Sequence, residues 1–421
     1  MKQRPLMPSE WVEITGRGVV SSAGLTVAEF DRVILSGESR IGEFRDMGSF
    51  SGLRFAMGSP VRGFEPAAHF DDKTLSGLDR FTQFAAVAAR QAAAEAGLME
   101  GGRFDLGIPR ERIGVIIGSA NGGIDSLDDG FRRFLTQDLK PKPLTVPMTM
   151  GSAPASRIAR EIGARGPAFG VSSACASGAH AILLGAMLIR SGAVDVMVVG
   201  GADSCFCEGY LRAWDALRAV SPDTCRPFSI GRRGLVIGEG AAVFVLEKAG
   251  RAAARGARAK AFLGGAAMGC DAGELTVPDE EGMARAMREA LSDAGLATGE
   301  VDYVNAHGTG TQVNDRLEAA AIRRVFAHGR RQPAVSSTKS AIGHAMGASG
   351  ALELLATIAA LENSVAPPTL NFLGPDPACD IDVTPNEPRR LSIAAALSNS
   401  FAFGSLNVSL LVARPDWRPR P

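Results

Sequence analysis

The chain has 421 residues, which is ample for a large hydrophobic core. Its 45 basic and 45 acidic residues give a formal net charge of zero, which argues against a general binder of nucleic acid or of anionic membranes. Hydrophobic residues make up 46% and charged residues 21%, the usual composition of a globular enzyme.

The first half of the chain alternates helix and strand signals. Residues 90–98 are expected to contain the end of a helix, stopped by Gly97, and small, helix-favouring residues predict a second helix over 179–189. Apolar runs predict strands at 114–118, 169–171, 194–204 and 240–248. The longest apolar run, 179–189, is too short to span a bilayer, so we expect no membrane span.

The second half repeats this order of elements. A helix end (288–296), a strand (301–308), a V-S-S sequence with a small-residue helix (335–355) and two further strands (394–404 and 406–412) follow one another. Non-alternating apolar strands are typical of sheets covered on both faces, and alternating strands and helices predict mainly parallel strands. We therefore expect two duplicated α/β halves, residues 1–250 and 251–421, with the small-residue helices between their sheets.

The segment 125–149 has no counterpart in the second half and contains three prolines. We interpret it as an insertion that builds a pocket wall or a subunit contact. The N-terminus lacks the apolar segment of a signal peptide, and the six cysteines lack zinc-type spacing. A protein of the reducing cytoplasm is the expectation that follows.

Cys175 follows the strand at 169–171 and precedes the helix at 179–189. Free N–H groups at a helix start favour a thiolate and can also bind an oxyanion, so this position suits a nucleophile. The alternative is an inert cysteine buried among small residues.

His307 and His344 lie at strand or loop ends of the second half, as Cys175 does in the first. Ligands of doubly wound α/β proteins bind outside the carboxyl ends of the strands, so a pseudo-twofold arrangement would bring the three groups together. Lys339 and Glu353 could form an ion pair that orients the histidine loop. Structural histidines, a solvated ion pair and, for Phe403, a buried aromatic are the alternatives.

Four sequence blocks resemble the signatures of β-ketoacyl-[acyl carrier protein] synthases of the type II, elongating kind. They are SACASG around Cys175, AHGTGT around His307, STKSAIGHAMGASG around His344 and NSFAFG around Phe403. The resemblance covers nearly the whole chain. It implies the thiolase-like fold, a duplicated five-layered α-β-α-β-α sandwich.

The resemblance also implies a reaction. Cys175 takes an acyl chain from an acyl carrier protein, and loss of CO2 from a malonyl carrier protein yields a carbanion that attacks this thioester, giving a 3-oxoacyl carrier protein. His307 and His344 stabilise the enolate, while the N–H groups of Cys175 and Phe403 form the oxyanion hole. The resemblance implies no metal or organic cofactor, substrates carried on phosphopantetheine, and a homodimer or a heterodimer with a chain-length-factor-like subunit.

Supporting roles are implied by the same blocks. Thr309 and Thr311 match contacts to phosphopantetheine. Phe403 matches a gate on the acyl pocket. The polar network that supports the histidines is matched by three residues: Asp315, Lys339 and Glu353.

The sequence departs from housekeeping elongation enzymes in its acyl pocket. Asn121 stands where an apolar side chain is usual, and Trp214 replaces a smaller aromatic. A buried amide needs partners, so these residues favour specialised fatty-acid, polyene or polyketide synthesis over long saturated chains. Carrier docking would depend on Arg212 and Arg218.

Three alternatives to this function stay open. The first is housekeeping fatty-acid elongation. The second is a non-catalytic partner subunit of the chain-length-factor kind, although such subunits typically lack the reactive cysteine. The third is a thiolase or acyltransferase that uses coenzyme A, although the only late cysteine, Cys379, lacks the glycine-flanked setting of thiolases.

Overall fold

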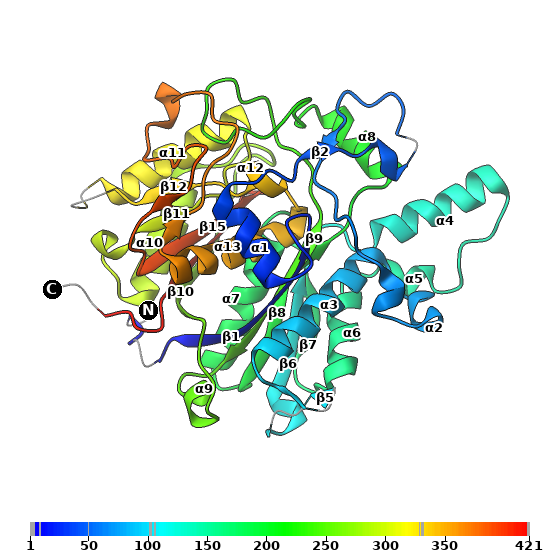
Figure 1. The fold of residues 1–421 in the computed structure, drawn as a ribbon, viewed down its shortest axis with the longest axis horizontal. Helices are drawn as coiled ribbons and strands as arrows, with labels where there is room; N and C mark the ends of the chain where they lie inside the picture. The colour runs from blue at the N-terminus through cyan, green and yellow to red at the C-terminus, as the bar shows by residue number, and fades with distance from the viewer. Residues whose placement is uncertain are drawn as a thin grey trace.

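The computed structural model describes residues 5–7, 10–48, 50–100, 103–104, 107–327, 329 and 332–418. Its main feature is one ten-stranded sheet built from two five-stranded halves (Figure 1). The first half has the order β7-β6-β8-β9-β1 and the second the order β12-β11-β15-β16-β10. Their bounds are β1 Val12–Ser21, β6 Ile113–Gly118, β7 Ala168–Val171, β8 Val196–Asp203, β9 Gly240–Glu247, β10 Ala261–Cys270, β11 Tyr303–Asn305, β12 Ala334–Ser336, β15 Ala395–Ala402 and β16 Leu406–Ala413.

The two orders correspond strand by strand, so the predicted duplication is confirmed. β1 and β10 join the halves through an antiparallel pairing of Val12–Ile14 with Ala261–Leu263. The prediction of mainly parallel strands is confirmed for four of the five strands in each half. The exceptions are β9 in the first half and β16 in the second, each of which runs antiparallel to both of its neighbours within its half.

Helices cover the sheet in three layers, completing the five-layered sandwich. α7 (Ser177–Arg190) and α13 (Ser349–Asn363) lie between the two halves and pack into one core cluster. α3 (Arg80–Glu95) and α6 (Ala153–Ile162) cover the outer face of the first half, and α10 (Glu280–Ala294) and α11 (Gln312–Phe326) that of the second.

Small residues let the two central helices approach closely, as predicted. A Cβ atom added at Gly178 of α7 would lie 3.2 Å from the Ala351 Cβ of α13, and one added at Gly350 would lie 2.9 Å from the Ala179 Cβ. Larger side chains at these positions would push the halves apart. The central layer therefore fixes how the carboxyl ends of the two parallel strand sets face each other.

The insertion forms α4 (Ile124–Gln137) and α5 (Thr145–Thr149), and α4 projects from the body of the molecule (Figure 1). α8 (Glu208–Leu217) lies near α4. None of the helices in the described ranges is long and apolar enough to cross a membrane. The remaining elements are short or peripheral: α1 Val27–Ser36, α2 Asp72–Leu75, α9 Arg251–Ala254, α12 Lys339–Ile342, β2 Gly42–Glu43, β3 Met57–Gly58, β4 Met99–Glu100, β5 Arg103–Phe104, β13 Val365–Ala366 and β14 Arg389–Arg390.

Candidate active site

A cavity of about 400 Å³ brings the three predicted reactive groups together. Cys175 reaches it from the first half of the chain, and His307 and His344 from the second. The two imidazole rings lie 5.5 Å apart, nearly perpendicular. Several other predicted site residues line the same cavity, namely Thr309, Thr311, Trp214 and Phe403.

Cys175 occupies a tight turn between β7 and α7. The preceding residue, Ala174, has a left-handed φ of 49°, and the Ser177 hydroxyl accepts a hydrogen bond from the Ser173 N–H, which closes the turn. Desolvation raises the pKa of the Cys175 thiol to about 12, outweighing the nearby Lys339 ammonium and a hydrogen bond from the Phe403 N–H. Burial therefore opposes the thiolate state that the helix start was expected to favour.

Lys339 fixes one of the histidines. Its buried ammonium forms an ion pair with Glu353 and donates to the His307 backbone oxygen (2.5 Å) and to His307 Nδ1 (3.2 Å). The alternative of a solvated ion pair is thereby excluded. Because an ammonium only donates, Nδ1 must be the acceptor, and the neutral ring of His307 carries its proton on Nε2.

His344 has the same tautomer for a different reason. The Met346 N–H donates to His344 Nδ1 at 3.0 Å, and the Ser349 hydroxyl lies 2.9 Å from the same atom. Desolvation and the Lys339 charge lower the pKa values of His344 and His307 well below 6.5, so both rings are neutral. The cavity thus contains two fixed Nε2–H donors and no imidazolium.

Two buried carboxylates that the sequence analysis missed hold the histidine segments. Glu318 of α11 accepts hydrogen bonds from the N–H groups of His307 (2.8 Å) and Gly308 (2.7 Å). Asp203, at the end of β8, accepts from Ala120 N (2.9 Å) and Gly347 N (2.6 Å). An acidic residue that ends the apolar run of β8 was the available signal for Asp203.

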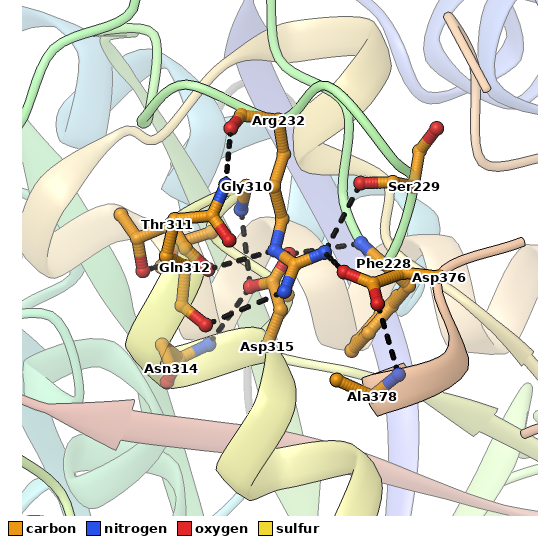
Figure 2. Close-up of polar contacts among 12 residues, drawn as sticks. Phe228, Ser229, Arg232, Gly310, Thr311, Gln312, Asn314, Asp315, Asp376 and Ala378 are labelled. Atoms are coloured by element: carbon orange, nitrogen blue, oxygen red, sulfur yellow. Dashed lines mark hydrogen bonds and ion pairs between the residues drawn. The ribbon is translucent and has the colours of Figure 1, made fainter. Parts of the chain in front are cut away.

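Asp315 does not contact either imidazole in the described structure, contrary to its predicted place in their network. It accepts from Gly310 N (3.2 Å) and Phe228 N (2.9 Å) and lies 3.8 Å from the Arg232 guanidinium (Figure 2). Arg232 also forms an ion pair with Asp376 (2.5 Å). This second network holds the loop between His307 and α11, so its support reaches the histidine only through the backbone.

Of the two residues predicted for the acyl pocket, Trp214 lines the cavity and Asn121 does not. Trp214 of α8 lines the cavity and stacks on Phe403, with ring centroids 6.3 Å apart. Asn121 is not part of the cavity lining and lies behind this wall, where its amide oxygen accepts a hydrogen bond from the Tyr210 hydroxyl (2.7 Å). The insertion 125–149 does not line this cavity either. It borders a second one, between α2, α3, α4 and α5.

Comparisons with known proteins give a consistent result over nearly the whole chain. A family model for the β-ketoacyl synthase N-terminal domain matches residues 9–252, and one for the C-terminal domain matches residues 260–373. Nodulation protein E of Rhizobium sp. (strain N33) is 42% identical over 95% of this chain and 98% of its own. The 3-oxoacyl-[acyl-carrier-protein] synthase 2 of Coxiella burnetii (strain RSA 493 / Nine Mile phase I) is 37% identical over 97% and 99%.

Two solved structures superimpose closely. The ishigamide ketosynthase/chain length factor has a TM-score of 0.90 at 34% identity, covering 96% of this chain and 99% of that one. A type II polyketide synthase ketosynthase, solved with its acyl carrier protein and bound to the hexaketide, has a TM-score of 0.88 at 29% identity, with the same coverage of both chains.

Proposed function

The chain belongs to the β-ketoacyl synthase family of condensing acyltransferases, and from that premise we propose that it extends an acyl chain held as a thioester on Cys175. The observation that carries the proposal is one cavity that joins this thiol to two fixed imidazole N–H donors. The reaction class and the geometry agree, because each group has a task in a decarboxylative condensation.

In the first step, the Cys175 sulfur attacks the carbonyl of an acyl carrier thioester and loses its proton, while the carrier thiol leaves with a proton. The negative charge on the carbonyl oxygen is stabilised by the N–H groups of Cys175 and Phe403. Because the resting group is a thiol, deprotonation accompanies attack, and the Lys339 charge favours it.

In the second step, a malonyl thioester loses CO2 and the electron pair of the broken bond forms an enolate. The Nε2–H groups of His307 and His344 donate to the enolate oxygen. The carbanion then attacks acyl-Cys175, a carbon–carbon bond forms, and the Cys175 sulfur leaves and regains a proton. Neutral rings suit this role because donation requires no proton transfer.

Thr309 and Thr311, whose hydroxyls lie 2.8 Å apart on the cavity wall, contact the phosphopantetheine arm in this proposal. The chemistry needs no metal or organic cofactor, the substrates arrive on the carrier, and the site of action is the cytoplasm. Residues 1–250 supply the nucleophile and residues 251–421 both histidines. Asn121 and Trp214 favour specialised synthesis over housekeeping elongation.

Reconstitution tests the function. The purified protein, a malonyl carrier protein and acyl carrier proteins of graded length are expected to give 3-oxoacyl products and CO2, with little use of long saturated primers. The masses of the 3-oxoacyl products show which primer lengths the enzyme accepts. A clear preference for a sixteen-carbon saturated primer would contradict specialised synthesis, and absence of any condensation would contradict the function itself.

Carrier docking is expected to depend on Arg218 and Arg233. Both are exposed, line the cavity and form no ion pair within the described residues. Arg212, predicted earlier, is neutralised by Glu208 at 2.7 Å. Replacing Arg218 and Arg233 by Gln should raise the KM for an acyl carrier protein about tenfold and weaken its salt dependence. Arg212→Gln is the matched control, and an equal effect there would contradict the assignment.

A subunit of the same fold is proposed to cover α4 and the edge strand β7. Phe134 and Leu135 of α4 are 59% and 73% exposed, and β7 ends the sheet with Phe169 39% exposed. An apolar surface beside an open strand edge favours pairing with another chain. The superimposed ketosynthase/chain length factor supports a partner of this kind.

Replacing Phe131 and Phe134 by Glu is expected to shift the protein toward monomers in light scattering, because the charges would be buried at the interface. Leu373→Glu, at an equally exposed apolar position outside α4 and β7, should leave the mass unchanged. A dimer that persists in the double variant would contradict this surface.

A further inference from the structure

An aromatic pair on α8 closes one side of the reaction cavity. Trp214 lines the cavity, and Tyr210, one helical turn earlier, packs against it at 6.2 Å with the rings nearly perpendicular. The Trp214 ring also stacks on Phe403, whose N–H reaches the Cys175 thiol. The wall therefore stands beside the atoms to which an acyl chain is attached.

The Asn121 side chain lies behind Trp214 and Tyr210, and only one of its two polar atoms has a hydrogen-bond partner among the described residues. The Asn121 amide oxygen accepts from the Tyr210 hydroxyl, but the amide nitrogen Nδ2 is buried and has no hydrogen-bond partner among the described residues. The surrounding cluster is apolar and includes Leu211, Met346 and Phe206. A buried donor without an acceptor costs about 1–3 kcal/mol, so an apolar side chain would be more stable here.

Two hydrogen bonds fix the orientation of Asn121, one at its backbone N–H and one at its side-chain oxygen. The Asn121 backbone N–H donates to Asp203 at 3.3 Å, and Asp203 also holds Ala120 and the Ser119 hydroxyl. The Tyr210 hydroxyl donates to the Asn121 amide oxygen at 2.7 Å. Because the amide oxygen accepts this hydrogen bond, the NH2 end of the amide points away from Tyr210 and has no partner among the described residues.

We propose that the free Nδ2–H of Asn121 donates a hydrogen bond to an oxygen atom of the acyl chain, so that the preferred primers are oxo- or hydroxyacyl chains. The inference rests on the proposed function and selects the polyketide-like class among its substrates. A chain that displaces the Trp214 ring meets Tyr210 and Asn121 next. A hydrocarbon at that point leaves the donor unpaired, whereas a carbonyl or hydroxyl oxygen satisfies it.

Matched primers test the inference. Acyl-pantetheine thioesters of one length are compared as saturated chains, conjugated dienes and chains with one oxo group at successive positions. The rate of acylation of Cys175 is followed by intact mass. One oxo isomer is expected to react about tenfold or more faster than the saturated chain. Equal rates for all oxo and saturated primers, or a preference for the diene, would overturn the proposal.

Variants separate recognition from structure. Asn121→Leu is expected to favour the saturated primer and lose the oxo preference, with an unchanged or higher unfolding temperature because the unpaired donor is gone. Tyr210→Phe should weaken the preference by releasing the amide. Leu275→Ala, which trims the same cavity elsewhere, should change all primers alike. An Asn121→Leu effect that is equal for all primers would show a purely structural role and overturn the proposal.

Failure of the proposed function has a different signature. In that case no primer forms an adduct, or the adduct persists in Cys175→Ala. If an adduct forms only on Cys175, and its rate of formation is the same for oxo and saturated primers, only the role of Asn121 is contradicted.

Discussion

Cys175→Ala is expected to abolish condensation while leaving decarboxylation of a malonyl carrier protein in place. The loss should reach at least about 10³-fold, because Cys175 is the only thiol among the described residues that line the cavity. Decarboxylation depends instead on the Nε2–H donors of His307 and His344, which the substitution does not touch. Intact mass and CO2 release, measured on the same preparation, separate the two steps.

A second cysteine provides the control. Cys270 is the one exposed cysteine among the described residues, so an acyl thioester can reach it without entering the cavity. Cys270→Ala should acylate like the native protein. An adduct that survives in Cys175→Ala and disappears in Cys270→Ala would assign the nucleophile to the wrong residue and overturn the mechanism.

Most of the fold could be predicted from the sequence because each half repeats the same short patterns of apolar and small residues. Apolar strands such as β6 and β8 and the small-residue helices α7 and α13 are recognisable from a few consecutive residues each. Strand direction was predicted less well. Whether β9 and β16 return parallel or antiparallel depends on long connections and on packing between distant segments, which no local pattern records.

For the candidate site, the sequence likewise indicated which residues take part but not their protonation states. The residue types at Cys175, His307 and His344 indicated the chemistry, and the structure places them in one cavity. The state of each group depends on its surroundings in three dimensions. Burial keeps Cys175 protonated, and a donor from the chain backbone sets the tautomer of His344. Neither effect can be read from neighbouring residues in the sequence.

Supporting residues were the hardest to predict, since their role is defined by what they contact. Asp315 and Glu318 lie one helical turn apart on α11, but only Glu318 accepts from the His307 backbone. Asp315 instead pairs with the Arg232 network. Sequence spacing places both on one helix face, and only the packing of the loop against that face distinguishes them.

Replacement of His344 tests whether the histidines act as donors or as acids and bases. His344→Ala removes the Nε2–H and is expected to reduce condensation by about 10²–10³-fold, the usual effect of losing one donor to a developing oxyanion. His344→Gln places an amide N–H near the same point, so it should recover part of the lost rate. Acylation of Cys175 should continue in both variants, because it precedes decarboxylation.

The pH profile sharpens this test. The pKa values of His344 and His307 lie well below 6.5, so both rings stay neutral as the pH rises through the usual pKa of histidine. The decarboxylation rate is therefore expected to be flat between about pH 6 and pH 8. A rate that follows a titration near 6.5, together with a glutamine variant as inactive as the alanine variant, would show that a proton is transferred. Donation by two fixed neutral rings would then be wrong, and the Lys339 and Met346 contacts that hold Nδ1 would need another explanation.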